Sequence, residues 1–339
     1  MKDLLRRLYS GENDVDFLGT RRTVAIVTAV LVVVLGGSLL FRGLSLGIEF
    51  EGGVVWEVPQ ADDVSTSDVE DLLDGLGVTS DRVQTVSGLS GDLFRVRGST
   101  EDLERQEEVQ AALAELNGVT IQDVSREEVG PSWGDEITEQ ARTALIWFFI
   151  VISAYIAIRF EWRMAIAAFV ALVHDIGVSV GVYSLFQFEV TPATVIAFLT
   201  ILGYSLYDTI VVFDKINDNT ALMTARGNDS YAEVVNRSLN QVVMRSINTS
   251  ITSVLPVASM LIVGSLLLGA SALQEFALAL LVGMLAGSYS SIFIATPVLV
   301  ALRERKPPEV RAATEETLAV DHPLAGGSAP RPRRRSKRR

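Results

Sequence analysis

The sequence of 339 residues contains no cysteine and only two histidines, His174 and His322. Without cysteine there is no disulfide, no thiolate metal ligand and no thiol nucleophile, so every folded part depends on its own core. The two histidines alone do not support a zinc site. A Walker-type phosphate loop and a nucleophile elbow are also missing, which argues against nucleotide hydrolysis and serine-hydrolase chemistry. We therefore expect neither an enzyme nor a bound cofactor.

Apolar residues make up 49% of the sequence and are concentrated in long runs, which is typical of an integral membrane protein. Six runs are long enough to cross a bilayer as helices: about Thr23–Phe41, Arg142–Ile158, Met164–Phe186, Thr191–Phe213, Val242–Leu268 and Phe276–Leu302. A polar segment of about 100 residues separates the first run from the second and is long enough for one folded domain. The sequence therefore predicts six transmembrane helices with one domain inserted between the first and the second.

Acidic residues dominate the polar segment. Residues 42–141 hold 23 Asp and Glu against 6 Arg and no Lys, a net charge of −17, whereas the whole chain carries −12. Basic residues cluster instead at Lys2, Arg6, Arg7, Arg21, Arg22, Arg159 and Arg163, and in the terminal run 331–339. By the positive-inside rule these positions mark the cytoplasmic side, so both termini are expected there and the acidic domain outside. No nucleic-acid partner is expected, because binding nucleic acid needs a basic footprint.

The predicted layout is a cytoplasmic N-terminus (1–22), transmembrane helix 1 (23–41), an extracytoplasmic domain (42–138), transmembrane helices 2–6 (142–302) with a cytoplasmic loop (214–241), and a basic cytoplasmic tail (303–339). The first apolar run lacks a small-residue cleavage pattern, so it is expected to stay as an anchor. The tail is rich in Pro, Gly and charge, which favours disorder. Its polybasic end suits anionic lipid, and a specific partner site is the alternative.

Strand and helix signals alternate in the extracytoplasmic domain. Strands are expected at 53–59, 82–87, 93–97 and 119–124. One helix is expected from Ser67 to Gly75, opened by a capping box of Ser67 and Glu70, and another from Ser99 to Leu116. This βαββαβ order favours a ferredoxin-like α+β sandwich, a fold that hosts many functions and identifies none.

Asp208 is a lone acid in the fourth apolar run, where a carboxylate costs roughly 2.5–3.5 kcal/mol on insertion scales. Such residues are rare and usually face a protein interior or a water path. Helical spacing places Thr194, Ile201, Ser205 and Asp208 on one face, with Tyr204 one turn before the acid. Carboxyl, hydroxyl and phenol together favour a proton relay. The alternative is a structural carboxyl that never changes charge.

His174 and Asp175 lie near the middle of the third run, about 11 residues and roughly 16 Å from its cytoplasmic end. Gly177 and Gly181 form a GxxxG pattern that permits close helix approach. Two hypotheses stand side by side for this pair. It belongs to a proton relay, or the acid bonds a neighbouring helix only to satisfy itself.

Arg245 begins a polar stripe in the fifth run, in which Arg245, Thr249, Thr252 and Pro256 share one face. Such a stripe faces protein or water rather than lipid. Arg245 lies about one turn inside the cytoplasmic boundary, at the depth of Asp208, so we expect the two to pair. The alternative is an arginine that snorkels to the interface.

Five blocks of the sequence resemble the SecF family of the resistance-nodulation-division superfamily and follow that family's order. They are LGIEFEGG (46–53), VGPSWGDE (129–136), the pair His174 and Asp175, AFLTILGYSLYDTIVVFDKINDN (197–219) and MRSINTS (244–250). The first two contain the family's motif residues Gly47, Glu49, Gly52, Gly53, Gly130, Pro131 and Gly134. The resemblance covers residues from about 17 to 302. Glu49 stands where the family usually has Asp, and Tyr207 where Asn commonly precedes the intramembrane Asp.

The resemblance implies a function. A SecF-type subunit works with SecD beside the SecYEG channel and uses the proton-motive force to promote late steps in the translocation of unfolded polypeptide across the plasma membrane. The resemblance also implies that Asp208 is the proton-binding acid and Arg245 its partner, with His174 and Asp175 as further candidates. A proton crossing the membrane releases about 2.3 kcal/mol per 100 mV, which a carboxylate that alternates between paired and protonated states couples to helix movement.

Two other functions stay open from the residues alone. A half-size subunit of a proton-driven efflux permease of the same superfamily would need similar acids, and a periplasmic adaptor would then co-purify in place of SecD. A translocon assembly factor that transduces nothing would carry the same charges for structural reasons. Neutralising Asp208 would then leave the complex working.

Overall fold

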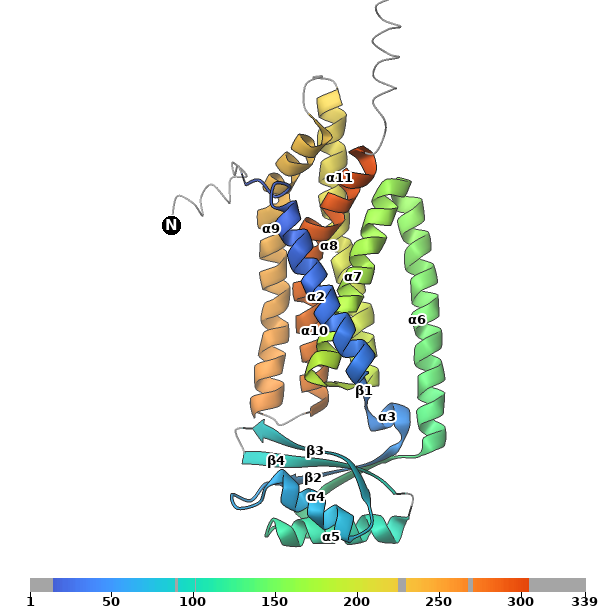
Figure 1. The fold of residues 1–339 in the computed structure, drawn as a ribbon, viewed down its shortest axis with the longest axis vertical. Helices are drawn as coiled ribbons and strands as arrows, with labels where there is room; N and C mark the ends of the chain where they lie inside the picture. The colour runs from blue at the N-terminus through green and yellow to red at the C-terminus, as the bar shows by residue number, and fades with distance from the viewer. Residues whose placement is uncertain (1–14, 89–90, 101, 225–229, 268–270, 305–339) are drawn as a thin grey trace, which may run out of the picture.

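A computed structural model describes residues 15–88, 91–100, 102–224, 230–267 and 271–304. Residues 1–14 and nearly all of the predicted disordered tail, 305–339, lie outside these ranges. A long bundle of helices stands on a small domain of strands and helices (Figure 1). Among the described residues, six helices are long and apolar enough to cross a membrane. The chain is a multi-pass membrane protein.

The six membrane helices follow the apolar runs of the sequence. They are α2 (Arg21–Arg42), α6 (Pro131–Arg159), α7 (Trp162–Phe186), α8 (Pro192–Thr224), α9 (Tyr231–Met260) and α10 (Ser271–Ser290). The last two run on beyond these bounds, α9 as the π-helix η2 (Leu261–Leu267) and α10 as the π-helix η3 (Ser291–Ala295) and then α11 (Thr296–Glu304).

Two boundaries predicted from the sequence are wrong. Helix α6 is continuous from Pro131, so the domain boundary expected between residues 138 and 142 falls inside a helix. In the expected loop 214–241 the second half has apolar residues at helical spacing, which indicates a short helix, and it forms the start of α9 at Tyr231; the first half, expected to be loop, continues α8 to Thr224. Ser230 and Glu233 form a capping box at that start. The composition of both segments is polar because these helical turns extend beyond the apolar spans, not because they lack helical structure.

Helices α7, α8 and α10 form the centre of the bundle. Their most apolar windows are 39%, 44% and 56% buried, against 11% for α2 and 6% for α6. Glycines bring α10 against α8: a Cβ on Gly283 would lie 2.3 Å from Cδ1 of Ile201, and one on Gly287 would lie 2.8 Å from the Cβ of Ser205. These two helices are therefore packed with their backbones close together.

The GxxxG pattern of α7 serves a helix contact through only one of its glycines. A Cβ on Gly181 would lie 2.5 Å from the Cβ of Leu35 on α2, whereas nothing lies within 4 Å of the same position on Gly177. Gly181 is therefore the residue that lets α2 cross α7 closely.

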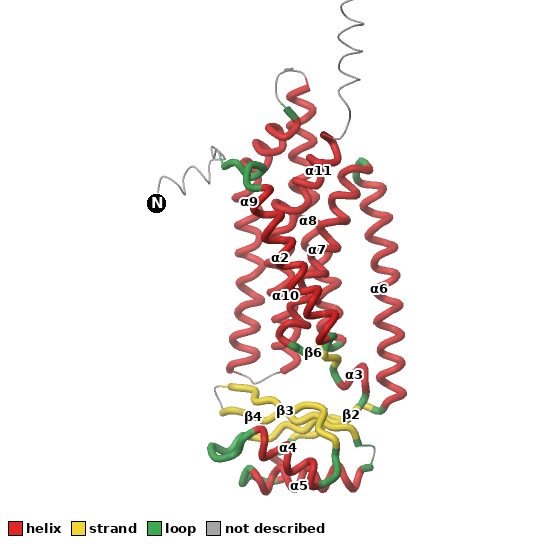
Figure 2. The backbone as a smooth tube through the Cα atoms, viewed as in Figure 1, coloured by secondary structure: helices red, strands yellow, loops and turns green. Residues whose placement is uncertain are grey.

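The α/β domain (residues 53–129) contains four strands and two helices. In chain order they are β2 (Gly53–Pro59), α4 (Thr66–Gly75), β3 (Thr79–Gly88), β4 (Gly91–Ser99), α5 (Leu103–Leu116), the short 3-10 turn η1 (Ile121–Asp123) and β5 (Ser125–Val129). All strand pairs are antiparallel, in the order β3-β4-β2-β5. Helices α4 and α5 cover one face of the sheet, and the other face is turned toward the membrane helices (Figure 2).

The core of this domain lies between the sheet and its two helices. Trp56 and Phe94 from the strands pack with Leu73 of α4 and Leu113 of α5, and all four side chains are fully buried. Alternate residues of β4 point to opposite faces of the sheet. Phe94 and Val96 therefore enter this core, while Arg95 and Arg97 face the membrane helices.

Three local predictions for this domain are wrong. Helix α4 is capped by Ser65 with Asp68, two residues before the expected box of Ser67 and Glu70. Asp102, not Ser99, caps α5, since its side chain accepts from the N–H of Glu104 at 3.1 Å. The last strand is 125–129 rather than 119–124, because Thr120 and Asp123 cap the 3-10 turn η1 within the expected strand.

Candidate functional site

Asp208 lies on α8 inside the bundle, with 7% of its surface exposed. Its carboxylate accepts a hydrogen bond from Ser246 Oγ of α9 at 2.9 Å, and another from Ser291 Oγ at the start of η3. No Lys or Arg among the described residues forms an ion pair with it. The acid is therefore held by hydroxyl groups from two other helices.

Asp175 lies on α7 and is fully buried. Its Oδ2 atom accepts from Ser290 Oγ of α10 at 2.8 Å and from Ser205 Oγ of α8. His174 Nδ1 is 3.2 Å from Oδ1, while the other ring nitrogen, Nε2, is buried without a partner in the described part of the chain. Asp175 is thus satisfied mainly by serine hydroxyls, as Asp208 is.

The two acids are connected through adjacent serines. Ser290 and Ser291 are neighbours in sequence, so their side chains leave the helix in different directions, one toward Asp175 and the other toward Asp208. The helix changes to π geometry at Ser291, and such changes frequently occur at functional sites. We call the set of Asp175, Asp208, Ser205, Ser246, Ser290 and Ser291 the carboxylate–serine cluster.

The expected pair of Asp208 and Arg245 does not form. Arg245 is exposed on the outside of α9, and its Nη2 donates to the hydroxyl of Tyr207 at 3.4 Å. Tyr207 precedes Asp208 on α8, and one residue turns about 100° around a helix, so the phenol faces outward while the acid faces inward. Ser246, the neighbour of Arg245, is the α9 residue that reaches Asp208 instead.

Two residues expected on the relay face of α8 have other roles. Thr194 lies at the start of the helix, where its hydroxyl accepts from the N–H of Thr191 at 3.2 Å. Ser205 bonds Asp175 rather than supporting Asp208. The serines of α9, α10 and η3 that reach the acids, including Ser246 and Ser291, were not predicted from the sequence. Serines recurring in otherwise apolar runs were the signal that could have found them.

The two glycine-rich motifs meet where the bundle joins the α/β domain. Helix α3 (Ile48–Glu51) lies in the first motif, between Gly47 and Gly52, and packs on the first turns of α6, which the second motif forms with Gly130 as N-cap and Pro131 as first residue. A Cβ on Gly134 would lie 2.8 Å from the carbonyl oxygen of Phe50, so only glycine allows this approach.

The glycines of the first motif shape the backbone where domain and bundle meet. Gly52 and Gly53 have φ angles of 75° and 122°, which L side chains rarely adopt, and they turn the chain from α3 into β2. The N–H of Gly47 donates to the carbonyl of Val190 at 2.9 Å, next to the short parallel pair of β1 (Ser45–Leu46) and β6 (Glu189–Val190). The motifs are therefore the joints between domain and bundle.

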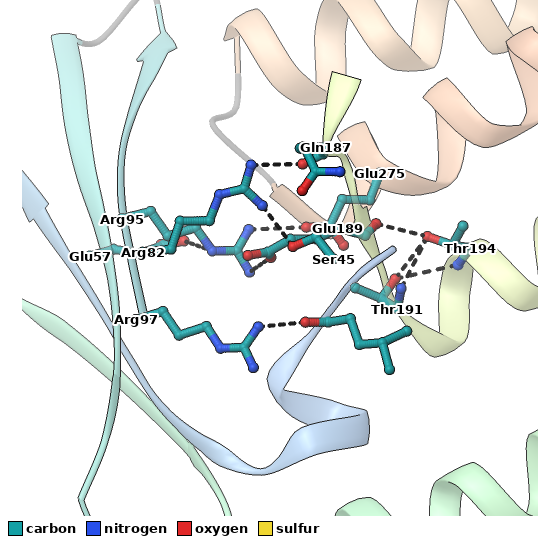
Figure 3. A network of polar contacts seen from close by, with 11 residues as sticks. Ser45, Glu57, Arg82, Arg95, Arg97, Gln187, Glu189, Thr191, Thr194 and Glu275 are labelled. Carbon is teal, nitrogen blue, oxygen red and sulfur yellow. Dashed lines mark hydrogen bonds and ion pairs between the residues drawn. The ribbon is translucent and has the colours of Figure 1, made fainter. Parts of the chain in front are cut away.

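Three arginines of the sheet face these joints (Figure 3). Arg95 faces more carboxylates than the other two arginines do, and its side chain is 15% exposed. Its guanidinium lies 3.0 Å from the carboxylate of Glu275, 3.6 Å from that of Glu189 and 3.7 Å from that of Glu57. Glu275 belongs to α10 and Glu189 to β6, so a strand of the α/β domain is tied to two parts of the bundle.

The other two arginines bind the segment between α2 and β2 and the connection between α7 and α8. Arg82 of β3 donates to Ser45 Oγ at 2.7 Å and to the carbonyl of Gln187 at 2.8 Å. Arg97 of β4, only 8% exposed, donates to the carbonyl of Leu46 and to the carboxylate of Glu51. We call Arg82, Arg95, Arg97 and their partners the arginine junction. The arginine junction was not predicted from the sequence, although Arg95 and Arg97 share one strand face in an otherwise acidic domain.

Burial and charge act against each other in the arginine junction. Burial by itself would lower the pKa of Arg95, but the carboxylates of Glu189, Glu275 and Glu57 outweigh it and raise that pKa. Glu49, half-buried in α3, has a raised pKa because burial disfavours its charged form. Arg95 is consequently held as a cation among three carboxylate side chains.

A cavity of about 410 Å³ adjoins Arg95 between sheet and bundle. It is lined by Arg82, Gln84, Thr85, Val86, Arg95, Tyr183, Phe186, Gln187, Phe188, Glu189, Gln274, Glu275 and Leu278. Among the described residues, no group of three or more His, Asp or Glu side chains is placed to hold a metal ion.

Comparison with known proteins confirms the resemblance to this family that the sequence indicated. A family model described as protein export membrane protein SecD/SecF, C-terminal, matches residues 108–305. The chain is 41% identical to the protein translocase subunit SecF of Streptomyces coelicolor over 313 residues, covering 92% of this chain and 83% of that protein. It is 40% identical over 309 residues to the subunit of the same name from Mycobacterium tuberculosis, covering 89% and 70%.

Solved structures give the same picture. The crystal structure of SecDF from Thermus thermophilus, described as a translocon-associated membrane protein, matches with a TM-score of 0.76 and 32% identity. The match covers 87% of this chain and 39% of that one, so the chain spans well under half of the longer protein. A second SecDF structure, in a super-membrane-facing form, matches with a TM-score of 0.61 and 31% identity over 90% of this chain and 40% of that one.

Proposed function

Because the chain belongs to the SecD/SecF family of protein-export membrane proteins, we propose that it acts as a SecF-type subunit in protein translocation. It works with a SecD-type partner beside the SecYEG channel and uses the proton-motive force to promote late steps in the passage of unfolded polypeptide. Asp208 is the proton-binding acid of this mechanism. Asp175 and His174 belong to the same relay, and Arg245 contributes to it from the outer surface of the helix bundle.

The observation that carries the proposal is the buried acid Asp208, which in the described part of the chain is held only by hydroxyl groups. A serine hydroxyl donates to a carboxylate and, after rotating, accepts from a carboxylic acid, so Ser246 and Ser291 suit Asp208 in both states. A cation in their place would favour only the charged state. A proton entering from the outer side changes which groups donate, and the helices that carry Asp208 and its serines shift in response.

A polar face on the outside of the bundle supports a membrane-embedded partner. Tyr207 of α8 is exposed, and Gly203 one turn before it has nothing within 4 Å of its Cβ position. On α9 the exposed polar residues follow helical spacing and include Arg245, Asn248 and Thr252. Lipid does not satisfy such groups, whereas helices with small or polar faces do. The SecD-type partner covers this face, and Arg245 contributes to the relay from there.

Orientation follows from charge. Both termini lie in the cytoplasm and the α/β domain lies outside the plasma membrane, since Lys and Arg cluster before the first span, between the second and third spans and at the C-terminus. The strand order β3-β4-β2-β5 and the two covering helices support a ferredoxin-like sandwich for this domain, which contacts the translocating polypeptide or moves against its SecD counterpart. The C-terminal polybasic run binds anionic lipid.

The rival functions make different predictions. The relatives are named translocase subunits, which favours export over efflux. The test uses inverted vesicles in which a secreted precursor is transported with and without a proton gradient, at matched protein abundance. Asp208→Asn is expected to abolish the gradient's stimulation without loss of membrane insertion, because an amide cannot exchange the proton.

The matched control is Asp214→Asn on the same helix, where the acid is partly exposed and pairs with Arg159 at 2.8 Å. This variant is expected to keep most of the stimulation. If Asp208→Asn transports precursor with wild-type stimulation, the protein is an assembly factor and the proton mechanism is wrong. Co-purification of a periplasmic adaptor in place of SecD would instead support the efflux permease.

A further inference from the structure

Helix α10 takes part in both polar regions of the molecule. Near its beginning, Glu275 contacts Arg95 of the α/β domain at 3.0 Å. Near its end, Ser290 and Ser291 bond the two buried acids. The two ends are separated by 15 residues, or roughly 22 Å of continuous helix. A displacement or rotation of this one rigid element therefore reaches both regions.

We propose that α10 transmits the state of the carboxylate–serine cluster to the α/β domain, and that the contact of Arg95 with Glu275 is the coupling point. This inference rests on the proposed function, because it assumes that the cluster changes state. It assigns Arg95 and Glu275 as positioning residues that act through α10, since neither touches the buried acids.

Helix α7 provides a second connection between the same two ends. The Tyr183 hydroxyl of α7 donates to the backbone carbonyl of Glu275 at 3.0 Å. Two turns earlier on α7, Asp175 accepts from Ser290 of α10 at 2.8 Å. These two bonds connect α7 to α10 both near the buried acids and near the α/β domain. A change at the acids therefore moves the two helices together.

The contact of α10 with α8 favours sliding over separation. Gly283 and Gly287 present a smooth surface to Ile201 and Ser205 with no room for a side chain. Just beyond them, the π-helical turn η3 begins at Ser291, and a π-helix holds one more residue per turn than the α-helix it interrupts. A local shift at that turn changes the register of the serines without unfolding α10.

The domain end of this connection is polar rather than close-packed. Arg95 sits in a central strand of the sheet and faces three carboxylates, those of Glu57, Glu189 and Glu275. A cavity of about 410 Å³ lies beside it. Polar interfaces of this kind allow domains to move relative to each other, whereas a large apolar interface would hold them fixed. Arg95 therefore joins a rigid sheet to a movable contact.

The absence of native cysteine allows two introduced cysteines to be spin-labelled selectively in the full-length protein, in lipid nanodiscs and in the complex in which it is isolated. Suitable sites are Glu107 on α5 and Asp218 on α8, both exposed. The measurement is the distance distribution between the labels. Asp208→Asn, which mimics the protonated acid, is expected to shift its mean by more than the width of the distribution in the parent protein.

Breaking the coupling point should remove this response. In the Arg95→Gln background, Asp208→Asn is expected to leave the distance unchanged, and Glu275→Gln should do the same through a milder change that preserves folding. Arg105→Gln is the matched control, because Arg105 belongs to the same domain and, within the described ranges, bonds only Glu108 and the carbonyl of Leu76. The shift should persist in that background.

Three outcomes would overturn the inference: no shift on Asp208→Asn in the parent protein, an equal shift in both the Arg95→Gln and Glu275→Gln backgrounds, or loss of the shift in Arg105→Gln. Gradient-driven export measured on the same variants separates this inference from the function it rests on. Lost export with an unmoved domain refutes the coupling and leaves the proton mechanism standing. Wild-type export in Asp208→Asn refutes the mechanism itself.

Discussion

The carboxylate–serine cluster and the arginine junction both bury acids, but they satisfy them with opposite chemistry. In the bundle, Asp175 and Asp208 are bonded mainly by serine hydroxyls. At the junction, Glu189 and Glu275 face the guanidinium of Arg95. A hydroxyl donates or accepts, whereas a guanidinium only donates and stays charged. The first arrangement tolerates a change of protonation state, and the second opposes it.

This difference assigns different roles to similar residues. A carboxylate that is to change state needs partners that reorient, and the serines in the bundle meet that need at a depth where a fixed charge is expensive. Carboxylates that are to hold two domains together need partners that do not change, and arginine meets that need where the bundle meets the α/β domain. The location of each chemistry therefore fits the proposed division between a proton switch in the bundle and a joint between bundle and domain.

The largest expected effect comes from placing the chemistry of the junction inside the bundle. Ser246→Lys would put a cation beside Asp208 and hold it charged, so gradient-stimulated export should be lost completely. Ser246→Thr keeps the hydroxyl and should retain most of the stimulation. Export into vesicles at matched abundance measures both. Equal activity of the two variants would show that the hydroxyl does not matter.

Removing the cation from the junction should have the next largest effect. Arg95→Gln leaves the carboxylates of Glu57, Glu189 and Glu275 facing one another, and breaking a buried pair in this way costs about 3 kcal/mol. The free energy of opening is measured from hydrogen exchange of the Gly47 amide, which bonds the carbonyl of Val190.

Neutralising the acids in the same protein sharpens this result. Adding Glu189→Gln and Glu275→Gln to Arg95→Gln should recover most of the lost free energy, because the remaining groups are no longer charged. Arg105→Gln, an exposed control, should change stability by less than about 0.5 kcal/mol. A triple variant no more stable than Arg95→Gln would mean that packing, not charge, makes the joint.

The joint also depends on backbone contact, and a glycine tests this part separately. Gly134→Ala should destabilise the contact of α3 with α6 by about 2 kcal/mol, since its Cβ would lie 2.8 Å from the carbonyl oxygen of Phe50. Gly130→Ala is the matched control, because nothing lies within 4 Å of its Cβ position. Thermal unfolding of the two variants should differ clearly; equal melting would contradict the close approach.

Within the cluster, Asp175 should matter less than Asp208. Asp175→Asn keeps Ser205, Ser290 and His174 in place but puts a neutral amide where the carboxylate accepts from both serines, a loss of about 1.5 kcal/mol. Gradient-stimulated export should therefore fall partially, where Asp208→Asn abolishes it. Complete loss in Asp175→Asn would make the two acids equal members of the switch.

The smallest effect concerns pH. Glu49 has a pKa raised by burial above its ordinary value of 4.5, so the folded protein binds the proton more tightly than the unfolded chain. Its contribution to stability is then largest below pH 4.5 and decreases as the pH rises through the raised pKa. Glu49→Gln should flatten this part of the stability profile, measured by thermal unfolding between about pH 4 and pH 7. An unchanged profile would mean that another group titrates.

Much of the fold was predictable because it follows from patterns along the chain. The runs of apolar residues identified the six membrane helices, and period-two alternation identified β2 with the correct bounds, Gly53–Pro59. The caps of α4 and α5 were misplaced by two or three residues, since Ser, Asp and Glu near a helix start compete for the same role and only the folded backbone selects one.

The sequence by itself determined which acids are buried at the cost of their hydration. These are Asp175 and Asp208, because a carboxylate in a bilayer-spanning run is unfavourable whatever its partners. It also contained both glycine motifs. Only the tertiary structure decided the partners. Arg245 and Ser246 are adjacent on α9, and a turn of about 100° sends one outward and the other to Asp208. The arginine junction depends on contacts between residues up to 180 positions apart, which no local pattern encodes.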